Sequence, residues 1–476
     1  MTVNGPALRR IAYHAARWIW VVALAGLAAL AFPAPPGEAS AGLGAILRDA
    51  LILSIFWVLS LFYRRETYAN LRQVSAIGCL FAITLVGAGL VARAQPGLPE
   101  LIPMPLIAVM LTVLFNGRVS MIAVMILSVV VSLQPVFRNS PALFMCLAGG
   151  VPAALSVRSL RRRSHIYTAV VAAGAGYLAG ALALGLAGGW PPAAIGLRAA
   201  LGMANGLVSA SLALALLPVA ERFTQITSDL TLLELSDPSR PLLRRLSLEA
   251  PGTYAHCVAM ANLVEAACNR VGANGLLGRV GCYYHDVGKL ISPQHFVENQ
   301  TFGGNPHDRL QAGQSAEILK AHVTEGLKLA REAGLPDVVR AFVPEHHGTS
   351  EITYFLDRAR KQGDAAPRSA DFRYPGPKPQ SVETAVAMLA DSVEAALRVL
   401  HDLTPRKIED AIDHLVRSRI ADGQLDEAPI TLRQLDQVRD EFIRVLAGMH
   451  HHRIDYPESS GGIWSGWKPT QAAGGS

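Results

Sequence analysis

Eight apolar stretches in the first 220 residues restrict this chain to a polytopic membrane bundle over nearly half its length. A helix crosses the hydrocarbon of a bilayer in about 20 predominantly apolar residues. The second stretch is the weakest, because its clean run is short and must be extended over Arg48 and Asp49. The predicted spans are approximately residues 16–33, 45–63, 73–92, 99–116, 119–137, 141–157, 167–188 and 194–219.

Charge separates the two halves of the chain. Residues 1–220 contain 15 Arg, no Lys and four acidic residues, which gives a net charge of +11. Subtracting this from the net charge of +6 for the whole chain leaves −5 for residues 221–476. The alkaline balance therefore belongs to the membrane half. It gives no support to binding of a nucleic acid polymer, which would need a basic face on the soluble half.

The arginines also predict an orientation. With eight spans and the N-terminus inside, eleven arginines of the membrane half lie on the inner side and four on the outer side or at outer helix ends. Cytoplasmic loops carry an excess of Lys and Arg. The distribution therefore predicts that everything from Glu221 onward lies in the cytoplasm. We expect the first stretch to be an uncleaved anchor, since residues 34–37 make a poor signal-peptide cleavage site.

Composition divides the chain into four predicted parts. Residues 1–220 form the transmembrane domain, 221–250 a helical connector, 251–457 an all-helical domain and 458–476 a Gly/Ser-rich tail expected to be disordered. The fold class is all-α, because strand patterns are scarce and apolar residues recur at helical spacing. The connector could transmit motion or pair with a second copy in a homodimer, or it could be a helix packed on its own domain.

Five histidines and two aspartates form the chemical core of the helical domain. We expect His285 and Asp286 to lie together on a helix over residues 280–290. Imidazole and carboxylate are the ligands that hold divalent metals such as Mn, Fe and Zn. A two-metal site of this kind positions a hydroxide for in-line attack on phosphorus. The seven candidate metal ligands are His256, His285, Asp286, His322, His346, His347 and Asp391.

With these motifs, the domain resembles the HD-domain metallophosphohydrolases. It is most similar to the membrane-bound seven-transmembrane HD phosphodiesterases of bacteria, which hydrolyse cyclic di-AMP. The matching segments are residues 233–236, 249–256, 284–290, 298–300, 305–308, 322–323, 346–349, 372–379, 389–395 and 452–457. Many relatives carry a large extracellular domain after the first span, whereas here that segment is a loop of about a dozen residues, approximately 33–44.

The resemblance implies a function and a division of the ligands. One ion, Mn or Fe, would be held by His256, His285, Asp286 and Asp391, and a second by Asp286, His322, His346 and His347. Asp286 would bridge the two ions and would be a catalytic residue. The enzyme would open cyclic di-AMP to linear pApA at the cytoplasmic face of the inner membrane.

Five residues are expected to contact the substrate. Lys289 follows the His-Asp pair closely and could neutralise a phosphate, which makes it a catalytic candidate as well. Arg373, Tyr374 and Lys378 lie in a proline-rich loop and could bind a phosphate or stack on a base. His307 is the fifth candidate.

Three other functions compete with this reading. Cyclic di-GMP phosphodiesterases of the related HD-GYP type would show Gly-Tyr-Pro after the histidine doublet, but Gly348 and Thr349 follow it here. A membrane receptor that binds a nucleotide without turnover would not need all seven ligands. Transport through the spans would call for more intramembrane charge than Arg48, Asp49 and Arg198 provide.

Overall fold

The computed structural model describes residues 6–33, 39–63, 70–157, 166–300, 304–362, 367–398 and 404–449. The predicted disordered tail, residues 458–476, lies outside these ranges, as do the loop residues 34–37 and the arginines within 158–163. Contacts divide the chain into two compact units, Met1–Asp237 and Pro238–Ser476. The four-part division of the sequence stays a prediction.

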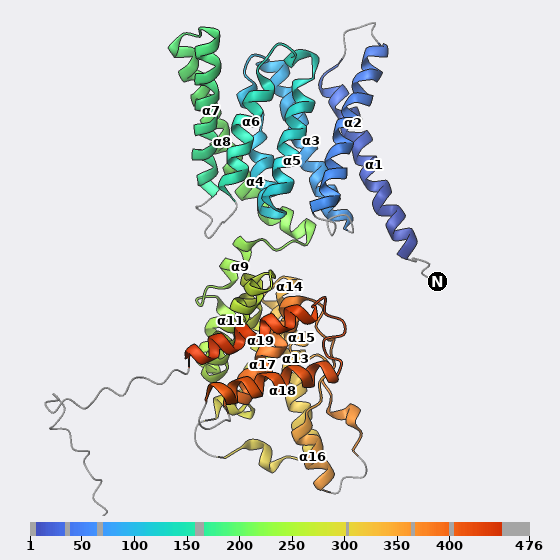
Figure 1. Ribbon diagram of the computed structural model, residues 1–476, viewed down its shortest axis with the longest axis vertical. Helices are drawn as coiled ribbons and strands as arrows, with labels where there is room; N and C mark the ends of the chain where they lie inside the picture. Colours follow the sequence, from blue (N-terminus) through green and yellow to red (C-terminus); the bar gives the residue numbers. More distant parts are fainter. Residues whose placement is uncertain are drawn as a thin grey trace, which may run out of the picture. The chain divides into compact units, whose positions relative to one another are not determined.

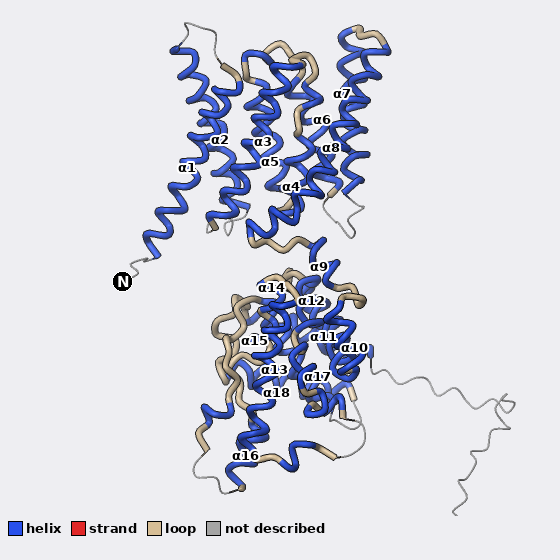
Figure 2. Tube along the Cα trace, turned by 180° about the vertical axis from the view of Figure 1, so that it is seen from behind, coloured by secondary structure: helices blue, strands red, loops and turns tan. Residues whose placement is uncertain are grey.

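The all-α prediction is confirmed. Every regular element of the described residues is a helix, and the one β-type pairing among them is an isolated bridge between Glu351 and Arg373 (Figure 2). The first unit carries a helix at each predicted span (Figure 1). These helices are α1 (Pro6–Ala31), α2 (Ala39–Tyr63), α3 (Leu71–Ala94), α4 (Met104–Leu114), α5 (Gly117–Ser132), α6 (Ala142–Ser156), α7 (Tyr167–Gly188) and α8 (Pro192–Thr224).

Four of these helices are long and apolar enough to cross a bilayer, namely those over Ser40–Phe62, Leu71–Ala94, Tyr167–Gly188 and Pro192–Thr224. The other four apolar helices have described parts of only 10–17 residues. One cause is the break between α4 and α5, where the Asn116 side chain accepts a hydrogen bond from the amide of Val119 and starts a new helix. The structure supports a membrane protein, and the count of eight spans stays a prediction.

Two ion pairs lie within the described part of the membrane unit. Arg48 Nη2 lies 2.8 Å from Asp49 Oδ1, and Gln134 donates to the same carboxylate at 2.9 Å. Arg198 lies 3.1 Å from the fully buried carboxylate of Glu100. A charge in hydrocarbon is costly unless it is paired. These pairs therefore explain how the bundle accommodates these ionised side chains.

The second unit is built around α17 (Val382–Arg398), which is buried on most of its faces. The remaining helices are α10 (Pro241–Glu249), α11 (Pro251–Arg270), α12 (Gly275–Tyr284), α13 (Ala312–Glu332), α14 (Asp337–Arg340), α15 (Phe342–Glu345), α16 (Thr353–Lys361), α18 (Pro405–Ala421) and α19 (Leu432–Met449). The apolar side chains of α17 belong to one buried cluster with Met260 and Val264 of α11 and with Val438 and Phe442 of α19. The first unit ends with the short helix α9 (Asp229–Leu235).

The predicted helix over residues 280–290 is wrong in its second half. The α-helix ends at Tyr284, Asp286 adopts φ −109° and ψ 15°, and a 3-10 helix, η5 (Val287–Ile291), follows. A methyl group on Gly288 would lie 1.8 Å from the carbonyl oxygen of His322. The chain therefore leaves the α-helix where η5 must pack closely on α13.

Candidate metal centre

Five segments of the second unit bring the seven predicted ligands together. His256 lies within α11, His322 within α13 and Asp391 within α17. The two doublets occupy helix ends, His285 and Asp286 after α12 and His346 and His347 after α15. A doublet at the end of a helix can direct two adjacent side chains to one point, which a continuous helix would separate by about 100°.

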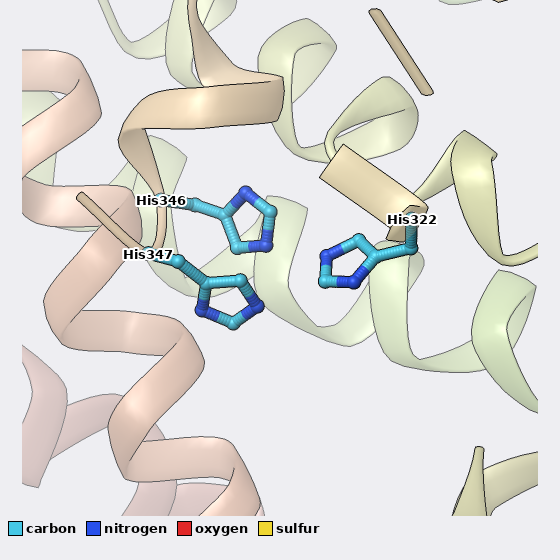
Figure 3. A group of neighbouring side chains, drawn as sticks. All are labelled: His322, His346 and His347. Carbon is cyan, nitrogen blue, oxygen red and sulfur yellow. The ribbon is translucent and has the colours of Figure 1, made fainter. Parts of the chain in front are cut away.

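The side chains form two groups with the spacing of metal ligands. His256, His285 and Asp286 make one group, and His322, His346 and His347 make the other. Within each group, one ligand atom from each residue lies within 4.8 Å of the others. Figure 3 shows the second group, in which the imidazole of His322 faces those of His346 and His347. Each group could hold one divalent cation.

The carboxylate of Asp286 lies between the two groups. Its Oδ2 is 3.7 Å from Nε2 of His256 and 3.2 Å from Nε2 of His285. Its Oδ1 is 3.5 Å from Nε2 of His322 and 3.6 Å from Nε2 of His346. One oxygen therefore faces each group, as a carboxylate that bridges two ions requires.

Asp391 is shared in the same way. Its Oδ1 lies 3.2 Å from Nε2 of His256, and its Oδ2 lies 3.8 Å from Nδ1 of His347. His347 and Asp391 are also the most exposed of the seven ligands. Of their side chains, 19% and 17% are accessible, against at most 4% for the others. A substrate would reach the centre from the side of His347 and Asp391.

The residues present fit a metal, as their unpaired atoms show. Buried polar groups without hydrogen bonds cost about 1–3 kcal/mol each and are rare in folded proteins. Asp286 Oδ2 forms an ion pair with Lys289 Nζ at 2.7 Å but has no hydrogen-bond partner. Six buried ligand atoms lack a hydrogen-bond partner, namely Nε2 of His256, His285, His322 and His346 and both carboxylate oxygens of Asp286.

The opposite nitrogens of the same imidazoles are held by protein. Nδ1 of His285 contacts the carbonyl oxygen of Cys282 at 2.8 Å, and Nδ1 of His346 contacts that of Phe342 at 2.9 Å. Nδ1 of His322 contacts the carbonyl oxygen of Leu319. A hydrogen bond of this kind fixes the proton on Nδ1 and leaves Nε2 free to coordinate a metal.

Electrostatics favours neutral imidazoles in the second group. Burial lowers the pKa of His322 to about 4 and that of His346 to about 3, and it holds the pKa of His347 well below its usual value. A neutral imidazole is the form that binds a metal. Burial opposes ionisation of Asp286, but its interactions with the neighbouring imidazole of His285 and with the charge of Lys289 outweigh it and hold the Asp286 pKa well below its usual range.

Two of the predicted substrate contacts border the centre. Lys289 lies 2.7 Å from Asp286 Oδ2 and 2.7 Å from Glu298 Oε1, so its charge is already shared between two carboxylates. The ring of Tyr374 stacks on that of His347, with centroids 4.1 Å apart and planes 21° apart. Tyr374 therefore lies on the exposed side of the centre.

The other three predicted contacts are engaged elsewhere. Arg373 donates to the carbonyl of Thr349 at 2.9 Å and lies 3.3 Å from Asp422. Lys378 lies 3.6 Å from Asp426. His307 contacts the carbonyl oxygen of His295 at 2.9 Å and the ring of Phe355, and none of its described contacts is with the seven ligands. Substrate contact by these three residues stays a prediction.

Sequence reasoning missed the acidic residues that support the ligands. Nδ1 of His256 lies 2.9 Å from Oε2 of Glu394, which also pairs with Arg398 at 2.7 Å. The available signal was local, because Glu394 follows Asp391 by three residues and so shares its helix face. Glu298 gave no comparable local signal, because its contact with Lys289 depends on how the chain folds between residues 289 and 298.

Comparison with known proteins identifies the family. Residues 40–228 match the family described as 7TM receptor with intracellular HD hydrolase, and residues 253–396 match the HD domain. The chain belongs to this family of membrane-bound HD-domain proteins. The resemblance drawn from the motifs is thereby confirmed, and the seven clustered side chains are consistent with the metal dependence of HD-domain hydrolases.

Two curated relatives extend this comparison. The chain is 44% identical over 266 residues to the cyclic-di-AMP phosphodiesterase PgpH of Bacillus subtilis (strain 168), covering 56% of this chain and 37% of the relative. It is 32% identical over 419 residues to PgpH of Listeria monocytogenes, covering 86% of this chain and 58% of the relative. The chain thus spans less than two thirds of the length of either.

Among solved structures, the HD domain of the L. monocytogenes phosphodiesterase PgpH is 43% identical and covers 45% of this chain and 100% of that domain, with a TM-score of 0.43. The same domain in complex with cyclic-di-AMP is 42% identical, with a TM-score of 0.44, and has the same coverage.

Proposed function

We propose that this protein is a membrane-anchored, metal-dependent phosphodiesterase that hydrolyses cyclic di-AMP to linear pApA in the cytoplasm. The observation that carries the proposal is the set of six buried ligand atoms without a hydrogen-bond partner, four from histidines and two from Asp286, which lies between the two groups. Two relatives named cyclic-di-AMP phosphodiesterase, 44% and 32% identical, support the substrate. The cytoplasmic location rests on the distribution of arginines in residues 1–220.

Two divalent ions, Mn or Fe, fit the two groups. One would be held by His256, His285, Asp286 and Asp391, and the other by Asp286, His322, His346 and His347. Bound there, such ions activate water as a nucleophile at neutral pH and offset negative charge on phosphoryl oxygens.

The protein's own residues prepare this site before substrate binds. Burial of the histidines keeps bulk water away from all but the side of His347 and Asp391. Lys289 keeps Asp286 ionised and fixes its orientation. Tyr374, stacked on His347 at the exposed side, is placed to contact a base or phosphate of the substrate.

The proposed product specifies which bond breaks. Formation of pApA requires that in-line attack by water on one phosphodiester expels the 3′ oxygen, which leaves a 5′-phosphate and a free 3′-hydroxyl. The linear product no longer closes a ring across the site, so the second cleavage should be much slower. Adenine specificity rests on the named relatives.

The test uses the full-length chain in detergent with Mn²⁺ or Fe²⁺ and equal concentrations of cyclic di-AMP and cyclic di-GMP, with products separated by chromatography. We expect pApA to accumulate and cyclic di-AMP to react faster. Asp286→Ala should abolish turnover and reduce bound metal. His414→Ala, an exposed histidine of α18, should change neither.

Each alternative has its own result. A faster rate with cyclic di-GMP would reassign the enzyme to that substrate. Binding of either dinucleotide without hydrolysis, in the presence of bound metal, would establish a receptor without turnover. Near-normal activity of Asp286→Ala with two ions per chain would reject the assignment of the centre.

A further inference from the structure

The arginine and the two lysines that the sequence predicts as substrate contacts already have acidic partners. Lys289 pairs with Asp286 and Glu298, Arg373 with Asp422, and Lys378 with Asp426. The positive charge of each of these side chains is therefore partly neutralised before a substrate arrives. Their pairing raises the question of which group would bind the second phosphate of a cyclic dinucleotide.

Arg419 on α18 differs from these basic side chains in its partners. Its Nε and Nη2 donate to Oγ of Ser392 at 3.1 Å and 3.0 Å, and within the described part of the chain it forms no ion pair with a carboxylate. Ser392 Oγ in turn donates to the carbonyl of Met388 at 2.9 Å. The guanidinium is thus half-buried and held in one orientation, but its charge is not neutralised.

The position of Arg419 relates it to the exposed side of the centre. Ser392, its anchor, directly follows Asp391 on α17. The turn after α18 is fixed to the segment after His347, because Gln424 accepts a hydrogen bond from the amide of Thr349 at 2.9 Å and donates to its hydroxyl at 3.1 Å. Arg419 is therefore attached on both sides to segments that carry the two most exposed ligands.

The chemistry of the substrate supplies the missing counter-charge. A cyclic dinucleotide has two phosphodiesters in one ring, so when one lies at the metals the other stays close by. Guanidinium is the side chain best suited to bind phosphate, because its planar fork can donate two parallel hydrogen bonds. An oriented, unneutralised guanidinium gains more from such an anion than one that already has a carboxylate partner.

We propose that Arg419 binds the second, uncleaved phosphodiester of the cyclic dinucleotide. This inference rests on the proposed phosphodiesterase function and adds to it a residue that recognises the ring as a whole. Arg419 does not touch the reacting atoms. It should affect binding of substrates with two phosphates and leave the chemistry at a single phosphodiester unchanged.

The experiment compares Arg419→Gln with the wild-type chain on two substrates, in detergent with Mn²⁺. Cyclic di-AMP carries both phosphodiesters, and bis(p-nitrophenyl) phosphate carries only one. We expect the KM for cyclic di-AMP to rise by about tenfold or more, as for loss of a charge-assisted contact, with little change in kcat. Rates with bis(p-nitrophenyl) phosphate should be unchanged. The matched control is Arg417→Gln, an arginine of the same helix with 81% of its side chain exposed.

Affinity for a phosphorothioate analogue of cyclic di-AMP, measured by equilibrium binding, separates recognition from turnover. It should fall in Arg419→Gln in parallel with the rise in KM. Equal loss of activity on both substrates would show that Arg419 only supports the fold, and unchanged affinity and KM would also overturn the inference. If the wild-type chain neither binds nor hydrolyses cyclic di-AMP, the proposed function fails first, and this inference fails with it.

Discussion

Glu394→Gln should weaken metal binding at one half of the centre and spare the other. Oε2 of Glu394 lies 2.9 Å from Nδ1 of His256, and Arg398 Nη2 donates to both carboxylate oxygens, at 2.7 Å and 2.8 Å. The carboxylate is therefore held in place and holds the proton on Nδ1. This leaves Nε2 of His256 facing Asp286 and Asp391.

The size of the effect follows from these contacts. Glutamine keeps the shape of the side chain, but it is neutral, and one of the two accepting oxygens is replaced by an NH2 group. Replacing a charge-assisted hydrogen bond by a neutral one removes roughly half its strength, about 1–1.5 kcal/mol. Since 1.4 kcal/mol is a factor of ten, we expect metal affinity to fall by about 10-fold, within the 10–100-fold range for such supporting groups.

The loss should be confined to one ion. Glu394 contacts His256, whereas His322, His346 and His347 have no described contact with it. Metal content, measured by mass spectrometry after dialysis against buffered Mn²⁺, should therefore fall from two ions toward one per chain. Excess Mn²⁺ should restore activity. Glu332→Gln, an exposed glutamate of α13, is the control.

Three results would refute this reasoning. Wild-type metal content in Glu394→Gln would show that Glu394 does not orient His256. Equal loss of both ions would show that the two groups do not act as separate sites. Activity that excess Mn²⁺ fails to restore would point to a role other than metal binding.

Two further predictions concern the fold and the orientation. Gly288→Ala should lower the melting temperature strongly, because its methyl group would lie 1.8 Å from the carbonyl oxygen of His322. The control is Gly313→Ala, whose methyl group meets nothing within 4 Å and should leave the melting temperature unchanged. Equal melting temperatures of the two variants would contradict the packing of η5 on α13. A C-terminal fluorescent-protein fusion should be bright and an alkaline phosphatase fusion silent, as the arginine distribution requires; the reverse pattern would place the HD domain outside the cytoplasm.

The parts of this protein that depend on residue type and period could be predicted from the sequence. Long apolar stretches can satisfy their backbone in a bilayer only as helices or closed barrels, so the helices of the membrane unit follow from composition. The seven ligands could be named because histidines and aspartates in doublets are unusual within one helical domain. Six of them converge in two groups, and Asp391 contacts a histidine of each group.

The parts that depend on tertiary contacts could not be predicted. Val287 and Leu290 continue the helical pattern of α12, yet the chain turns after His285 because Gly288 must approach α13. Arg419 reaches Ser392 across 27 residues, and no local pattern distinguishes it from exposed Arg417. Lys289 seemed available for phosphate, but Glu298, nine residues further on, already pairs with it.

A chain of alternating charges that runs from Asp286 to Glu394 and is closed by the imidazole of His256 explains how the centre can be ordered before any cation binds. Asp286 pairs with Lys289 at 2.7 Å, and Lys289 pairs with Glu298 at 2.7 Å. Arg398 lies 3.7 Å from Glu298 and 2.7 Å from Glu394. Glu394 contacts His256, which lies 3.7 Å from Asp286. Breaking a buried pair on one side leaves an uncompensated charge, which costs about 3–5 kcal/mol. Although burial opposes their ionisation, these neighbours hold the pKa values of Glu298 and Glu394 below their usual range. This chain of charges therefore keeps Asp286 and its supports ionised and in position, which is the state that a divalent cation needs in its ligands.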